Sequence, residues 1–299
     1  MQGWRRPMMV GGYVAYGLAL FGLFVYITFP GQQVRALVLT SLSHHGLHQI
    51  RIGAVHPLFP PGLAFRQVSV AHEANGQPVE LLRMPEVRTY LRPPVPFGNL
   101  LRLHFEGEVY GGNLLGDVAW ASAGEGPAVE ISAQFQDVHL DALPLAGRLG
   151  KANLEGKLEG SMTWRLTGSR WEDGEGSFIF KAKETGGLAG LEVMGVRFPP
   201  LAYEQLGGKL VLQARTVVIQ EDILALGRNR TWQLNVQGRI GLRDILPQST
   251  LDLTLRVRAS EALEQQLGLV GTFLKQRRDR RGFSSFRVGG TLGNPTFIQ

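Results

Sequence analysis

Apolar and polar residues alternate over long stretches of this chain of 299 residues. The longest stretch runs for 15 residues from Leu154 to Gly168, with Leu154, Leu158 and Trp164 on one side and Glu155, Lys157 and Arg165 on the other. Successive side chains of a β-strand point to opposite faces, so this pattern predicts a strand with one dry face and one wet face. At about 3.3 Å per residue, such a strand would span roughly 50 Å.

The same period of two recurs along the rest of the chain. It is clear in Val129–Phe135, Trp232–Leu242, Leu251–Val257 and Phe286–Leu292. Short turns rich in glycine separate these segments, which favours antiparallel neighbours. The predicted fold is therefore mainly β, a long-stranded antiparallel sheet that is curled or sandwiched. Three covers for its dry faces remain open: a second sheet, the same sheet curled on itself, or a ligand.

The N-terminal segment predicts a membrane anchor. Residues 8–29 form a run of 22 residues without a charge, and Pro30 ends it. A transmembrane helix needs about 20 such residues. Arg5 and Arg6 precede the run, which predicts a cytoplasmic N-terminus over residues 1–7. A cleaved signal peptide is the alternative, but the bulky residues 27–30 do not suit a cleavage site. We expect a single-pass protein of the bacterial inner membrane, with residues 49–299 as a periplasmic β domain.

Two amphipathic helices are expected beside this sheet. The first lies in residues 30–48, next to the membrane, with Val34, Leu37, Val38 and Leu42 on one face. The second begins at Ser260, a good N-cap, and carries an apolar stripe of Leu263, Leu267, Val270 and Leu274. We expect the second helix to plug one end of the sheet.

Composition narrows the classes of function. The chain has no cysteine, which excludes disulfides and thiolate catalysis. Its net charge of +6 suits anionic lipid surfaces, and the predicted anchor argues against nucleic acid. Neither a Gly-x-Ser-x-Gly elbow nor a phosphate-binding Gly-Lys-Ser/Thr loop occurs. We therefore expect a protein that is not an enzyme and needs no cofactor.

Two polar clusters are candidates for metal sites. His44 and His48 are four residues apart, next to His45, but no carboxylate lies near them, so a polar helix end is favoured. The acidic residues Glu172, Asp173 and Glu175 lack the ligand spacing of a calcium loop, so a turn between strands is favoured. No metal site is predicted.

Six aromatic residues on the dry sides of predicted strands are candidates for an apolar groove. They are Phe135, Trp164, Phe178, Phe180, Trp232 and Phe286. Core packing is the ordinary role for such residues. The alternative is a groove for acyl chains, which would leave a continuous apolar surface exposed.

The densest basic run lies after the second predicted helix. It contains Lys275, Arg277, Arg278, Arg280 and Arg281. A solvated loop is the ordinary interpretation. The functional alternative is contact with anionic lipid.

The order of several segments resembles the type II secretion system protein N family, in its delta-proteobacterial form, and through it the AsmA-like proteins. The residues concerned are the anchor ending at Phe29-Pro30, the stretch 149–160 leading into Trp164, the segments 238–242 and 249–253, and the closing strand 286–297. The resemblance to the secretion family implies an inner-membrane accessory of type II protein secretion whose partners are other inner-membrane or periplasmic secretion components. The resemblance to AsmA-like proteins implies instead a groove that binds phospholipid. The first function is favoured, and the second is kept as the alternative.

Overall fold

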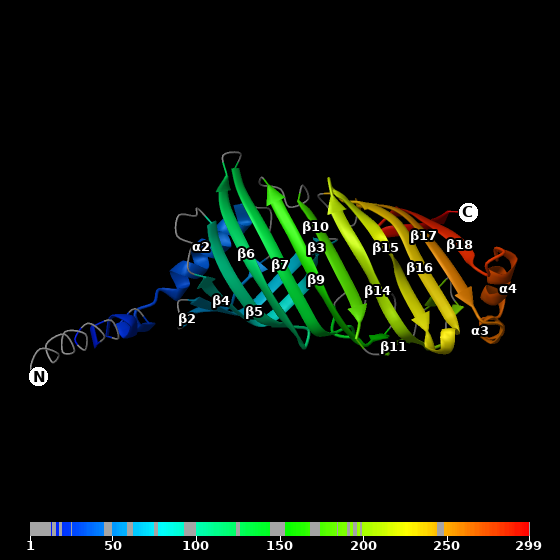
Figure 1. The fold of residues 1–299 in the computed structure, drawn as a ribbon, viewed down its shortest axis with the longest axis horizontal. Helices are drawn as coiled ribbons and strands as arrows, with labels where there is room; N and C mark the ends of the chain where they lie inside the picture. The colour runs from blue at the N-terminus through cyan, green and yellow to red at the C-terminus, as the bar shows by residue number, and fades with distance from the viewer. Residues whose placement is uncertain are drawn as a thin grey trace, which may run out of the picture.

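One large antiparallel sheet dominates the computed structural model of this chain (Figure 1). The structure describes residues 13, 16–17, 20–24, 26–44, 50–58, 62–74, 77–92, 100–123, 126–143, 153–167, 174–183, 185–189, 192–193, 196–197, 199–243 and 248–298. Within these residues, 17 strands belong to the sheet and two short ones form a separate pair. The predicted fold class, mainly β with a large curled antiparallel sheet, is confirmed at this level.

The strands follow the chain as a meander. The first half comprises β1 (Ile50–Arg51), β2 (Ala54–Leu58), β3 (Gly62–Ala74), β4 (Gln77–Arg92), β5 (Leu100–Val109), β6 (Gly112–Ala123), β7 (Gly126–His139), β8 (Asn153–Glu155) and β9 (Lys157–Thr167). The second half comprises β10 (Glu175–Ala182), β11 (Gly186–Ala189), β14 (Leu201–Gln213), β15 (Thr216–Gly227), β16 (Trp232–Gly241), β17 (Thr250–Ala259), β18 (Ser284–Thr291) and β19 (Asn294–Ile298). A 3-10 turn, η3 (Arg228–Arg230), joins β15 to β16, and β12 (Glu192–Val193) pairs with β13 (Val196–Arg197).

Each long strand pairs with the next one, always antiparallel. The order is β2, β3, β4, β5, β6, β7, β9, β10, β14, β15, β16, β17, β18 and β19. Figure 1 shows these strands side by side along the longest axis of the molecule. The strands are long because the alternating pattern continues for more than ten residues in several of them.

The predicted 15-residue strand is broken in one place. Gly156 separates β8 from β9 with φ +134°, a backbone conformation that favours glycine. A Cβ at Gly156 would meet the hydroxyl oxygen of Tyr203. That hydroxyl donates a hydrogen bond of 2.7 Å to the carbonyl of Glu155, and burial raises the pKa of Tyr203. The break is thus filled and held by one buried tyrosine from β14.

The N-terminal edge of the sheet is covered by a helix. Helix α2 (Gly31–His44) packs against β1 and β2, and Gly31 lies against the backbone of Val55. Val34 and Val38 are half-buried as predicted, whereas Leu37 is 68% exposed. His45 and His48 lie outside the described residues, as do residues 172–173. The described part of the predicted anchor is helical and carries exposed Tyr13, Phe21 and Ile27.

A complete membrane-spanning helix is not found within the residues that the structure describes. Residues 8–12, 14–15, 18–19 and 25 of the predicted anchor lie outside them. The anchor therefore stays a prediction from the sequence.

The second predicted helix proves to be two. Ser260 caps α3 (Glu261–Gln266) by accepting a hydrogen bond from the backbone of Leu263, as expected. Gly268, at φ +55°, then turns the chain into α4 (Leu269–Gln276). The prediction of one continuous helix was wrong, because a left-handed glycine ends the first helix where the apolar stripe alone would allow it to continue. Leu267 and Leu274 are buried, so the predicted stripe does face the protein.

Candidate functional site

The two faces of the sheet differ sharply in chemistry. We call the apolar face the side that carries Phe178, and the polar face the opposite side. Residues paired directly across neighbouring antiparallel strands lie on the same face. The pairings therefore allow each face to be followed from strand to strand.

One row of the apolar face crosses fourteen strands. From β2 to β19 it contains Pro57, Leu63, Thr89, Phe105, Gly116, Ala133, Met162, Phe178, Leu210, Ile219, Gly238, Leu253, Val288 and Phe297. Thr89 is the one polar residue in this row. A continuous apolar track therefore runs the length of the sheet.

A second row lies two residues further along each strand. From β4 to β17 it contains Leu91, Leu103, Val118, Ile131, Trp164, Gly176, Leu212, Val217, Ile240 and Leu251. This row has no polar side chain. The two rows together make the apolar face at least two side chains wide over ten strands.

Much of this face remains open. Trp120 is 50% exposed, Leu91 46% and Met162 37%, although all three lie on the apolar side. Trp164 and Phe178 are half-buried. A closed core leaves side chains of this size almost wholly buried. Within the described residues, this face is therefore only partly covered by the protein itself.

The buried part of the face is a small aromatic cluster. Phe135 stacks on Phe178 with ring centroids 5.4 Å apart, and Phe178 lies 5.6 Å from Phe180. Val109 and Val138 are buried beside Phe135. These side chains form a local core on one segment of a much longer apolar surface.

All six predicted groove residues lie on the apolar face, but only three come together. Phe135, Phe178 and Phe180 form the aromatic cluster, and Trp164 lies nearby on β9. Trp232 lies at the far end of β16, where its indole N–H donates to the carbonyl of Ala202 at 3.1 Å. Phe286 lies on β18, 5.8 Å from Phe273 of α4. The sequence prediction did not include two half-exposed aromatic residues on this side of the sheet, Trp120 and Phe273. Trp120 could have been predicted, because it lies two residues after Val118 on β6 and therefore on the same face.

The polar face is stabilised by charges paired across strands. Glu86 on β4 contacts Arg66 on β3 at 3.3 Å, and Arg165 on β9 contacts Glu130 on β7 at 3.4 Å. Arg88, on the same strand as Glu86, contacts it at 2.6 Å. The hydrogen bond from Arg88 lowers the pKa of Glu86. The guanidinium of Arg287 likewise lowers the pKa of Asp252, 2.9 Å away. Such pairs help to fix the register of neighbouring strands.

The predicted basic run is not a uniform cationic surface. Lys275 and Arg278 both pair with Glu264, a buried carboxylate on α3. The backbone of Arg281 donates to Asp279, and its carbonyl accepts from Arg258. Arg280 is exposed. Arg277 lies over the ring of Phe273 at 4.8 Å and near that of Phe286 at 6.0 Å.

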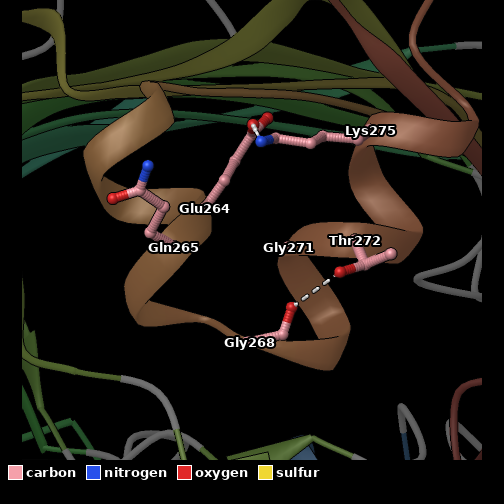
Figure 2. A pocket seen from close by; sticks show the side chains of 6 residues that line it. All are labelled: Glu264, Gln265, Gly268, Gly271, Thr272 and Lys275. Atoms are coloured by element: carbon pink, nitrogen blue, oxygen red, sulfur yellow. Dashed lines mark hydrogen bonds and ion pairs between the residues drawn. The ribbon is translucent and has the colours of Figure 1, made fainter.

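A hollow of about 480 Å³ lies between α3 and α4 (Figure 2). It is lined by Glu264, Gln265, Gly268, Gly271, Thr272 and Lys275. The hydroxyl of Thr272 donates to the carbonyl of Gly268 at 3.3 Å, and Lys275 reaches toward Glu264 across the hollow (Figure 2). The hydrogen bond of Thr272 lies within the first turn of α4, and the ion pair between Lys275 and Glu264 joins α4 to α3.

Groups suited to metal binding do not gather in the described part of the chain, where no three His, Asp or Glu side chains lie close enough to share an ion. The comparisons with known proteins add no further guide. No family model, curated protein or solved structure matches this chain. The resemblance to a secretion family therefore stays a prediction from the sequence.

Proposed function

We propose that this protein binds the acyl chains of lipids on the apolar face of its sheet. The observation that carries the proposal is the row from Pro57 on β2 to Phe297 on β19, which is apolar at every position except Thr89. Exposing apolar surface to water costs free energy of about 25 cal/mol per Å². An apolar ligand that displaces the water from this face is therefore stabilised there. Large apolar side chains left half-exposed on this face, such as Met162 and Trp120, are typical of a binding site rather than of an ordinary surface.

The shape of the surface suits chains rather than compact molecules. Neighbouring strands lie about 4.8 Å apart, so fourteen strands extend roughly 60 Å across the sheet. Half-exposed side chains such as Trp120 and Met162 offer contact along this track without closing it into a pocket. A lipid chain could lie along the rows and pass from strand to strand.

The predicted anchor supports this proposal, because it would hold the surface beside a membrane. Its described residues carry exposed side chains such as Tyr16, Phe24 and Ile27, which suit a lipid environment. In this proposal the protein is held in the bacterial inner membrane by residues 8–29 and the sheet lies in the periplasm. A protease added outside spheroplasts should then digest the sheet, and full protection would contradict this placement.

A photoreactive side chain at matched positions tests the binding proposal. Met162 is 37% exposed on the apolar face, and Ile179, next to it across the β9–β10 pair, is 43% exposed on the polar face. In cells, a photoreactive phenylalanine analogue at position 162 should form adducts with labelled phospholipid. The same analogue at position 179 should form few. Equal yields at the two positions, or none at 162, would rule out acyl binding on the apolar face.

A second candidate is the accessory role in type II secretion. The edge strand β19 favours it, because β19 pairs only with β18 among the described strands, and its Phe297 is 58% exposed. An open edge can accept a strand from another protein. A crosslinker at Thr296 should then capture a secretion component, identified by mass, while one at Val218 on an interior strand should not. Failure to recover any secretion component from Thr296 would remove this candidate.

A further inference from the structure

The C-terminal end of the apolar face is capped by α4. Ser284 on β18 pairs with Val257 on the apolar face, and its hydroxyl donates to the carbonyl of Leu274 in α4 at 2.6 Å. Phe273 of the same helix stacks on Phe286, whose partner across the strands is Leu255. Helix α4 therefore lies on the apolar side, and a chain lying along the rows would meet it at this end.

Arg277 differs from the other cations at this end. Lys275 and Arg278 share the one carboxylate of Glu264, whereas Arg277 has no carboxylate partner among the described residues. Its guanidinium lies 4.8 Å from the centroid of Phe273 and 6.0 Å from that of Phe286. A guanidinium held over a ring by cation–π attraction keeps N–H groups that can donate to an anion.

The surrounding charge also favours an anion. Residues 275–281 contain five basic residues and one acidic residue, Asp279. Two backbone N–H groups, of Arg281 and Phe283, donate to Asp279 and lower its pKa. Arg256 on β17 lies 3.6 Å from the same carboxylate, so Asp279 already has partners other than Arg277. Arg277 thus has no carboxylate partner in the described part of the chain and lies where the apolar face ends. This arrangement suits a ligand that has an apolar chain and an anionic head.

We propose that Arg277 binds the anionic head group, a phosphate, of a lipid whose chain lies on the apolar face. This inference rests on the proposed acyl binding and adds the class of head group and the direction of the ligand. The chain points toward the middle of the sheet, and the head stays at the α4 end in contact with water. Phe273 and Phe286 act as positioning residues, because they hold the guanidinium at the margin of the apolar surface.

Two probes with the same chain separate head-group recognition from chain binding. A C16 alkyl phosphate and a C16 alcohol, each with the same diazirine, are bound to the purified full chain, and the adducts are counted by mass. The phosphate probe should label more strongly. Arg277→Gln should lower phosphate labelling about tenfold, since a charge-assisted bidentate pair is lost, and leave alcohol labelling unchanged. Arg280→Gln removes the same charge from an exposed neighbour and should change neither.

The outcomes distinguish the two proposals. If neither probe labels the wild-type chain, acyl binding itself fails. If both probes label equally and Arg277→Gln changes nothing, acyl binding stands and the head-group site is wrong. Inorganic phosphate at the probe concentration should not compete, because it lacks a chain. If it abolishes the preference for the phosphate probe, Arg277 serves a free-anion site, and the proposal is overturned.

Discussion

The two faces of this sheet are built from the same strands, yet their side chains are stabilised in different ways. On the polar face, charged side chains find partners across the strands, as Arg165 does with Glu130. On the apolar face, side chains such as Met162 and Trp120 share a continuous surface that the described protein covers only in part. The charged side chains of the polar face have partners within the protein, whereas half-exposed apolar side chains on the other face cost free energy in water that a bound apolar ligand would remove.

This difference explains where stability resides. The aromatic cluster at Phe135 is a true core, but it occupies one short segment of the apolar face. Elsewhere the sheet depends on its backbone hydrogen bonds, its cross-strand pairs and a few buried positions such as Ile219 and Val288. Substitutions on the apolar face should therefore separate into those that unfold the protein and those that affect only binding.

The largest expected effect is at Phe135. Replacing it with alanine removes a 9% exposed ring from its stack on Phe178 and should lower the free energy of unfolding by about 3–5 kcal/mol. Gln134→Ala changes the adjacent, exposed residue on the polar face and should cost within about 0.5 kcal/mol. Urea unfolding of both variants measures the difference. Similar losses at the two positions would show that the faces do not differ in this way.

A smaller effect is expected at the half-exposed Met162. Met162→Glu should leave the unfolding midpoint nearly unchanged, since the new carboxylate can stay in water. Labelling by an acyl probe should fall about tenfold, because a bound chain would have to desolvate that carboxylate. Ile179→Glu puts the same charge on the polar face and should leave labelling intact. If Ile179→Glu reduced labelling more than Met162→Glu, the acyl chain would bind the polar face instead.

The ion pair between Glu130 and Arg165 should contribute still less to the free energy of unfolding. Both side chains are more than half exposed and lie 3.4 Å apart, so a double-mutant cycle with Glu130→Gln and Arg165→Gln should give a coupling of about 0.2–1 kcal/mol. Acyl labelling should not respond to either change. A loss of labelling in these variants would mean that binding depends on the polar face.

Acid should weaken the polar face gradually. The pKa values of Glu86 and Asp252 are lowered by Arg88 and Arg287, so the folded state binds protons less readily than the unfolded chain. Their stabilisation is present above the ordinary carboxyl pKa of about 4 and is lost as the pH falls through the lowered values. Melting temperatures measured from pH 6 to pH 2 should decline across this window. Asp252→Asn should make the melting temperature fall less steeply with pH. An unchanged slope would show that the pair of Asp252 and Arg287 does not contribute to the pH dependence.

The alternation in the sequence was enough to predict both faces. Once strands pair in order, parity alone places Phe178, Trp164 and Phe286 on one side, and the structure has them there. Parity does not say how closely neighbouring side chains pack. The contact between Phe135 and Phe178 depends on two strands, β7 and β10, that flank β9. The sequence therefore predicted the surface but not which part of it forms a core.

The breaks in the regular elements were harder to foresee. Gly156 continues the alternating pattern, and only the hydroxyl of Tyr203, 47 residues later, explains why the strand is interrupted there. Gly268 likewise sits inside an apolar stripe that a single helix could present. The role of Arg277 depends on rings from two different elements, α4 and β18. Each of these features depends on contacts between residues far apart in the sequence, and a local sequence pattern cannot predict such contacts.

Acyl binding can be measured most directly with single-tryptophan chains in lipid nanodiscs. One variant keeps only Trp164, on the apolar face; the other carries Ile179→Trp on the polar face, with the remaining tryptophans replaced by phenylalanine in both. Brominated acyl chains quench tryptophan only on close contact. Acyl binding on the apolar face predicts that brominated phospholipid quenches Trp164 strongly and the tryptophan at position 179 weakly. Equal quenching of the two, or none at Trp164, would contradict it.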